Sequence, residues 1–372
     1  MEVTHNTSTN YAYKTWFDVM ASFSPDVKKY RLQDGGSYFF DPEHLEDFTS
    51  LKKKTGPQTK RVFDKINAKI VSQGGRVVCR CELFLDVLNV HKYFIHENQI
   101  KLELIRNSDE FLLMYDHKKE VAPGAQKIKY AIKFKKVELY YKIIKPSSQI
   151  RESHDNSLSK GEVAMIPFTQ TELSHRLIHP QSCNYQLFRI VNGPIIPKKI
   201  FVMFLNQENF NGQEDLNPFH FKHFDIKDIT FKWYTRCFPS DRYNLKWSEN
   251  EEQGLLELYH HFMDAIGIKN GNATNGISLQ KFRDFFPVFV FDRAPDACNG
   301  AHTHIPENGF IDLEFEVKDA LQHPIIAIIY SQYDKILTWK RSKGKGVDYA
   351  PEVEVINNFS VKGGVNEESV NY

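Results

Sequence analysis

Residues 310–318 have the sequence FIDLEFEVK, and this stretch decides the fold class. Apolar and charged side chains alternate strictly from Ile311 to Lys318. Because successive side chains of a β-strand point to opposite faces, the pattern predicts a strand with one buried and one solvated face. Residues 228–233 repeat the alternation, whereas residues 325–330 are almost continuously apolar, as expected for a strand that is covered on both faces.

The first half of the chain shows the same period. Residues 76–83, 98–106 and 127–143 alternate between apolar and polar side chains. Within the last range the apolar positions change from even to odd numbers, so we predict a bulge or break at Lys135–Lys136. Such a bulge would let both sets of side chains face one core: Ile132, Phe134, Val137 and Leu139.

Few helices are expected. Residues 251–266 place apolar side chains three and four positions apart, which predicts an amphipathic helix. Residues 278–285 begin with a serine suited to an N-cap, and residues 11–21 have a third helical pattern. The first of these helices is predicted to bury Leu255, Tyr259 and Phe262.

The apolar pattern is lost between residues 146 and 160, which become rich in serine, histidine and asparagine. We therefore predict an all-β chain of two sandwiches, with helices confined to loops. The expected divisions are a first sandwich at 1–147, a linker at 148–160, a second sandwich at 161–339 and a poorly ordered tail at 340–372.

Composition excludes several classes of protein. Apolar residues make up 41% and charged residues 26%, an ordinary balance for a folded chain. The 48 lysines and arginines nearly cancel the 47 acidic residues, which argues against a strongly basic nucleic-acid-binding domain. No apolar run is long enough for a transmembrane helix, and the polar residues 1–10 do not resemble a signal peptide. Five scattered cysteines indicate reduced thiols.

A metal site is one interpretation of residues 298–307, CNGAHTHIPE. His302 and His304 lie two apart, so on an extended segment they would point to one side, as in the first motif of the cupins. However, Gly300 and Glu307 have the wrong spacing for a cupin, and the second cupin motif is missing. We favour solvent-facing loop histidines and keep a cupin-like metal-dependent enzyme as an alternative.

Two other pairs of metal-binding residue types have simpler explanations. His220 and His223 are predicted to be surface or loop-packing histidines. Cys79 and Cys81 are predicted to lie on the apolar face of a strand, where a free cysteine behaves as a small hydrophobe. No Gly-rich phosphate loop, nucleophile elbow or His-Glu-x-x-His motif is present in the sequence.

Positive charge gathers in two places. The lysines between residues 127 and 136 suit an edge strand, where they oppose pairing with other chains. The second cluster is a candidate nucleic-acid contact without sequence specificity: Lys340, Arg341, Lys343 and Lys345.

Three longer segments together resemble a known family. They are residues 98–114 (NQIKLELIRNSDEFLLM), residues 199–231, and residues 286–337 with FVFDRAPDACNG and a closing IDLEFEVKDALQHPIIAIIYSQYDKIL. Their order and spacing resemble invertebrate proteins that are similar to the major capsid protein of Polinton (Maverick) elements and adintoviruses. Residues 4–30 fit the start of the same pattern.

The resemblance implies a double jelly roll: two jelly-roll sandwiches side by side, with three copies forming a capsomer. It implies no catalytic residues and no cofactor. The implied partners are further copies of the chain and a minor capsid or penton protein, and the implied location is the virion or the interior of a cell.

The sequence departs from the family pattern at both ends. Members have at least one strand before the segment that matches residues 4–30, so we expect an N-terminally truncated first jelly roll with an open sheet edge. The tail after residue 340 is also longer than the resemblance implies. A ligand-binding β-sandwich is a further alternative to the capsid interpretation.

Overall fold

The computed structural model describes most of the second half of the chain and parts of the first. Residues 8–32 form no strand, and the rest of the N-terminal segment where we expected an open sheet edge lies outside the described residues. The described residues are 8–32, 75–76, 78–90, 92–94, 102–113, 131–180, 182–191, 193–213, 215–248, 253–268, 274–293, 307–341 and 351–356.

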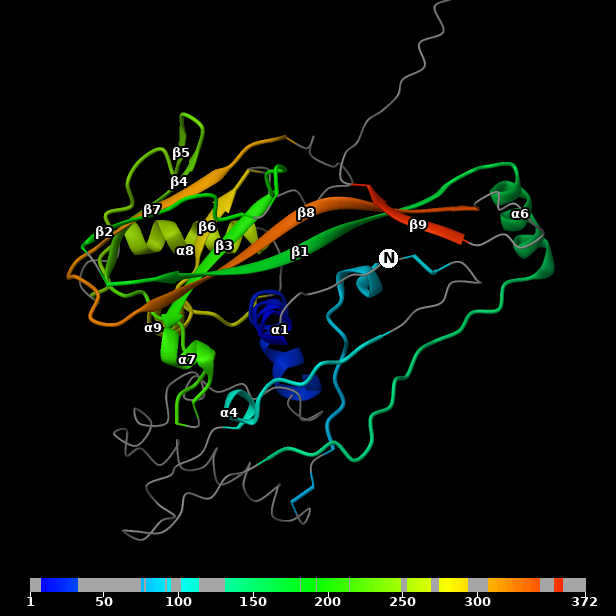
Figure 1. Cartoon of the computed structure of the whole chain (residues 1–372), viewed down its shortest axis with the longest axis horizontal. Helices are drawn as coiled ribbons and strands as arrows, with labels where there is room; N and C mark the ends of the chain where they lie inside the picture. Colours follow the sequence, from blue (N-terminus) through cyan, green and yellow to red (C-terminus); the bar gives the residue numbers. More distant parts are fainter. Residues whose placement is uncertain are drawn as a thin grey trace, which may run out of the picture.

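The larger of two antiparallel sheets is built around the longest strand, β8. Its strands lie in the order β1-β8-β3-β6, and β9 pairs with the far end of β8 (Figure 1). Their bounds are β1 Ala164–Ile178, β3 Lys199–Asn206, β6 Phe289–Asp292, β8 Ile325–Arg341 and β9 Pro351–Ile356.

The second sheet has the order β2-β7-β4-β5. Its strands are β2 Asn184–Leu187, β4 Ile226–Trp233, β5 Arg236–Phe238 and β7 Ile311–Val317. The two sheets share one apolar core, in which the ring of Phe204 on β3 lies 5.2 Å from that of Phe315 on β7. The predicted sandwich of the second half is therefore present.

The helices lie around this sandwich. Their bounds are α1 Ser8–Ser22, η1 Val27–Leu32, η3 Asp86–Asn89, α4 Asp109–Leu112, α6 Ser148–Ser159, α7 Gln207–Asn211, α8 Gln253–Ala265 and α9 Leu279–Phe285. None of these described helices has both the length and the apolar character that a membrane crossing requires.

Helix α8 confirms the prediction for residues 251–266. Leu255 and Phe262 are fully buried, and Tyr259 is half-buried. Gly267 follows the helix with a φ of +83°, the left-handed conformation that ends many helices, and its N–H donates to the Asp264 carbonyl. Local pattern and capping residues thus agree with the tertiary structure here.

The predicted strands of the first half are not formed in the described residues. Residues 78–85, 102–108 and 131–147 are extended or irregular and belong to no sheet. Phe134, Val137 and Leu139 are all more than half exposed, so the prediction that they face a core across a bulge is wrong. The alternation shows that a segment suits a strand, but a ladder also needs a partner strand, which the pattern does not specify.

Two further predictions for individual segments need correction. Cys79 and Cys81 are exposed rather than buried, because their segment is not part of a sheet. The predicted linker 148–160 contains α6, which begins at an N-cap where the Ser147 side chain accepts from the N–H of Ile150. This helix has no buried side chain, so an apolar period could not reveal it.

The predicted tail also contains ordered structure. β8 extends to Arg341, and β9 pairs with residues 336–341 of β8. An irregular tail is therefore wrong for residues 340–341 and 351–356. The division of the chain into an N-terminally incomplete first jelly roll and a second jelly roll remains a prediction.

Candidate functional site

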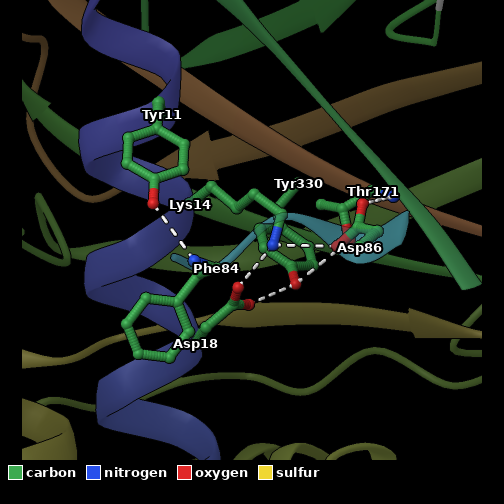
Figure 2. A network of polar contacts seen from close by, with 7 residues as sticks. All are labelled: Tyr11, Lys14, Asp18, Phe84, Asp86, Thr171 and Tyr330. Atoms are coloured by element: carbon green, nitrogen blue, oxygen red, sulfur yellow. Dashed lines mark hydrogen bonds and ion pairs between the residues drawn. The ribbon is translucent and has the colours of Figure 1, made fainter. Parts of the chain in front are cut away.

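Helix α1 packs on the larger sheet and positions the site. The Phe17 ring lies 4.4 Å from that of Tyr330 on β8 and 5.0 Å from that of Phe201 on β3. The hydroxyl of Tyr13 donates to the Pro218 carbonyl at 3.1 Å. These contacts bury one face of the helix against the sandwich core and direct Lys14 and Asp18 toward β1 and β8 (Figure 2).

Lys14 is the centre of a buried ionic cluster. Its Nζ lies 2.6 Å from Asp18 Oδ2, one turn further along α1, and 2.9 Å from Asp86 Oδ1 on η3. The Lys14 side chain is only 2% exposed. Two carboxylates therefore share one buried ammonium, and the ion pair of Lys14 with Asp86 joins residues that are 72 positions apart in the sequence.

Neutral groups complete the cluster (Figure 2). Tyr330 donates its hydroxyl proton to Asp18 Oδ1 at 2.6 Å, and Thr171 on β1 lies within 3.4 Å of the same hydroxyl. Asp86 accepts a hydrogen bond of 2.7 Å from the backbone N–H of Thr171. The cluster thus joins α1, η3, β1 and β8.

A neighbouring contact strengthens the same attachment. The hydroxyl of Tyr11, near the start of α1, accepts a 3.1 Å hydrogen bond from the backbone N–H of Phe84. The segment around η3 is therefore held by α1 at two points, Tyr11 and Lys14 (Figure 2).

The protonation of the cluster follows from its burial. Burial alone would lower the pKa of Lys14, but Asp18 and Asp86 outweigh it, and the pKa lies above its ordinary value. Burial raises the pKa of Asp18, and the contacts with Lys14 and Tyr330 only partly offset this effect. Burial together with the Asp18 charge raises the pKa of Tyr330 far above its ordinary value. Lys14 therefore stays charged, and Tyr330 stays a hydrogen-bond donor.

This arrangement is suited to holding α1 and η3 on the larger sheet. Both partners of Lys14 are side chains of the protein, and neither Lys14 nor Tyr330 is accessible to a solute. The chemistry available to the cluster is therefore the formation of charge-assisted hydrogen bonds that hold α1 and η3 to the sheet.

A second buried lysine binds the end of α1. Lys28 donates from Nζ to the carbonyl of Met20 at 2.7 Å and to that of Asn275 at 2.9 Å. Met20 lies in the last turn of α1, where the helix dipole favours a cation. Burial and, to a smaller extent, the nearby positive charge of Lys281 lower the pKa of Lys28 to about 7.

We expect Lys28 to make stability depend on pH between about 7 and 10. An unfolded chain holds the Lys28 proton up to the ordinary pKa of 10.5, whereas the folded protein releases it at about 7. The unfolded state therefore binds more protons in this window, and the free energy of unfolding should rise with pH. Urea unfolding of the natural protein and of Lys28→Met at several pH values tests this, since the variant should lack that part of the rise. Parallel pH curves would refute it.

The predicted site residues lie in different places. His302, His304, Lys343 and Lys345 lie outside the described residues. Within the described part of the chain, no group of three histidine, cysteine or acidic side chains could hold a metal ion.

Two members of the basic cluster belong to a sheet. Lys340 and Arg341 form the end of β8, opposite Glu352 and Pro351 of β9. Their role as nucleic-acid contacts is untested, but their backbone is part of a strand rather than of a tail.

The other two predicted histidines have packing roles. His220 is buried. His223 stacks on Trp247 at 4.3 Å, and its Nδ1 accepts from the backbone N–H of Asp225. Burial lowers the pKa of His223, which favours the neutral ring that this hydrogen bond requires.

A second candidate site is the apolar surface of residues 131–147, called the apolar segment below. It runs as an extended chain to the start of α6 (Figure 1). Among the described residues, the backbone groups of residues 133–146 have no hydrogen-bond partner. Seven of its large apolar side chains are more than half exposed: Phe134, Val137, Leu139, Tyr140, Tyr141, Ile143 and Ile144.

The sequence indicates parts of both candidate sites. The alternation of residues 131–143 marks the apolar segment, but it does not predict that the segment is exposed. The spacing of Lys14 and Asp18, four residues apart on a predicted helix, is a signal for an ion pair that went unused. Asp86 has no comparable local signal.

Comparison with known proteins gives distant matches. No protein-family model matches the chain. An uncharacterized protein of Caenorhabditis elegans is 21% identical over 355 residues, which cover 91% of this chain and 74% of that protein.

Three solved viral structures are also similar to the chain. A chain of the Sputnik virophage matches 56% of this chain and 42% of its own length, with 13% identity and a TM-score of 0.28. The mavirus major capsid protein matches 51% of this chain and 41% of its own length, with 11% identity and a TM-score of 0.28. A chain of the PBCV-1 virus capsid matches 50% of this chain and 52% of its own length, with 8% identity and a TM-score of 0.31. The matched part therefore spans about half or less of each of these viral chains.

Proposed function

We propose that this protein is a structural subunit of the double jelly-roll capsid type, derived from a virus, that works by self-association. Three features support the proposal: the resemblance of residues 4–337 to Polinton capsid proteins, the sandwich of the second half, and the exposed apolar segment. The proposed assembly is a trimeric capsomer that contacts further capsomers and a minor capsid protein, in a virion or inside a cell.

The single observation behind self-association is the apolar segment. Proteins that act as monomers seldom expose contiguous apolar surface of this kind, and such surface usually marks an interface. Here the exposed side chains lie within eleven residues, 134–144, whose backbone groups also have no partner in the described part of the chain. A further strand that pairs with the segment would cover the apolar side chains and provide hydrogen-bond partners for the backbone.

The full-length protein should therefore form oligomers. Sedimentation velocity over a range of concentrations should show association of the natural chain, and Val137→Ser/Leu139→Ser/Ile143→Ser should weaken it strongly. Because these side chains are already exposed, the variant should unfold at nearly the same urea concentration. Phe188→Ser/Tyr234→Ser is a matched control, because both residues are exposed apolar side chains outside the segment. A natural chain that stays monomeric would refute the proposal.

The two alternatives remain open to a simple test. Stoichiometric metal in the purified protein, lost on replacing His302 and His304, would favour the cupin-like enzyme. Saturable binding of an apolar small molecule by the monomer would favour a ligand-binding sandwich. The capsid proposal expects neither result.

A further inference from the structure

Strand β9 has an edge that no described strand covers. It pairs with β8 through residues 336–341, and no other described strand pairs with it. A strand edge of this kind presents a row of backbone donors and acceptors to which a further strand can be added.

The register of β9 also defines its two faces. Val353 lies opposite Trp339 and Val355 lies opposite Leu337. Trp339 and Leu337 belong to a small apolar cluster on one face of the β1–β8 ribbon, together with Ile166 and Phe168. By strand alternation, Glu352 and Glu354 take positions on the other face. The register positions of β9 thus alternate between valine and glutamate, and its outer edge, which no described strand covers, continues the sheet beside the end of β8.

We propose that residues 138–143 of the apolar segment add to the free edge of β9 in a second copy of this chain, as an antiparallel strand. This inference rests on the self-association proposed above and specifies its contact. The two stretches have the same length, six residues, and the same alternation of apolar and polar side chains. The apolar segment lacks a backbone partner among the described residues, and the outer edge of β9 would supply one.

Matching the apolar faces selects the register. When Tyr141 lies opposite Val353, Leu139 lies opposite Val355 and Ile143 lies opposite Pro351. All three exposed apolar side chains then share the face that carries Trp339 and Leu337. Pairs of an aromatic and a β-branched side chain directly across two strands stabilise a sheet.

Sheet topology selects the direction of pairing. In the antiparallel register Lys142 lies opposite Glu352, an attractive pair. A parallel strand with Tyr141 opposite Val353 would instead place Lys142 opposite Glu354, and it would be a parallel pair in a sheet whose described pairs are all antiparallel. The segment as a whole also carries five lysines and one glutamate, whereas β9 carries two glutamates and no basic residue. The segment and β9 are therefore complementary in charge.

Cysteine cross-linking tests the register directly. Residues directly opposite in an antiparallel pair are close enough for a disulfide. A chain with Tyr141→Cys and a second chain with Val353→Cys should form a disulfide between copies when mixed and oxidised, identified by mass spectrometry of the linked peptides. Tyr140→Cys in place of Tyr141→Cys is the matched control, because it places the thiol on the opposite face and should cross-link at least about tenfold less.

A charge exchange tests the direction. Lys142→Glu should weaken self-association by up to about tenfold, and adding Glu352→Lys to the same chain should restore it. Failure of the second change to rescue the first would contradict the antiparallel pairing.

The outcomes separate this inference from the proposed function. If the natural chain associates but no disulfide joins residues 141 and 353, self-association stands and the contact proposed here is wrong. If the two cysteines placed in one chain form only an intrachain disulfide, the segment pairs with its own β9 and the second copy is excluded. If the natural chain does not associate at all, both proposals fail.

Discussion

Replacing Lys14 by methionine should lower the free energy of unfolding by about 3–5 kcal/mol, the usual cost of removing one partner from a buried ion pair. The substitution leaves Asp18 and Asp86 near each other without the ammonium that neutralises both. It also detaches η3 from α1. Urea unfolding followed by tryptophan fluorescence measures the change.

A double variant distinguishes charge from packing. If unpaired carboxylates cause the loss, Lys14→Met/Asp18→Asn should recover part of it, because one buried charge is removed. Lys232→Met is the control, because Lys232 forms an ion pair with Glu314 on the surface, where such pairs contribute little. Equal stability of the single and double Lys14 variants would contradict the electrostatic explanation.

The loss should also depend on pH. The pKa of Asp18 is already raised in the folded protein, and removing Lys14 raises it further. A raised folded pKa means that the folded state binds more protons than the unfolded chain, so stability increases as pH falls toward that pKa. Lys14→Met should therefore be less destabilising at mildly acidic pH than at neutral pH. A pH-independent loss would indicate packing alone.

Replacing Phe262 by alanine should cost about 3–5 kcal/mol, the range for truncating a fully buried phenylalanine. Phe262 on α8 is fully buried, and its ring lies 5.4 Å from that of Phe282 and 5.5 Å from that of Phe286. Alanine would leave a cavity between α8, α9 and the larger sheet, because neighbouring aromatic rings cannot collapse fully into it. Chemical denaturation measures the loss.

Leu256→Ala is the matched control on the same helix. Leu256 is 43% exposed, so its truncation removes less buried surface and leaves no internal cavity. Both variants place an alanine in the same helix, so the difference between their losses of stability reports the burial of the replaced side chain. A near-neutral effect of Phe262→Ala would place α8 outside the core.

Local patterns predicted the elements whose partners lie in one well-formed core. Residues 310–318 became β7, with its four apolar side chains buried and its charged side chains directed outward. Residues 251–266 became α8, which is followed by Gly267 in the left-handed conformation. In both cases the side-chain period and the final environment agree, because one face of the element packs on the core.

The same period gave a wrong prediction for residues 134–139. Alternation is a property of one strand, whereas a ladder is a property of two, and nothing in the residues from Phe134 to Leu139 specifies which strand pairs with them. Helix α6 shows the opposite case, because a capping serine and helix-compatible polar residues form a helix without an apolar face.

By itself, the sequence determined β4, β7 and the first part of β8, helices α1, α8 and α9, and the apolar character of residues 131–147, since each depends on residues that are close along the chain. Only the tertiary structure decided that Lys14 meets Asp86, Thr171 and Tyr330 in one cluster. These four residues come from segments up to 316 positions apart, counting from Lys14 to Tyr330. No repeating pattern in the sequence indicates a contact between them, because the contact depends on how α1 and η3 pack against β1 and β8.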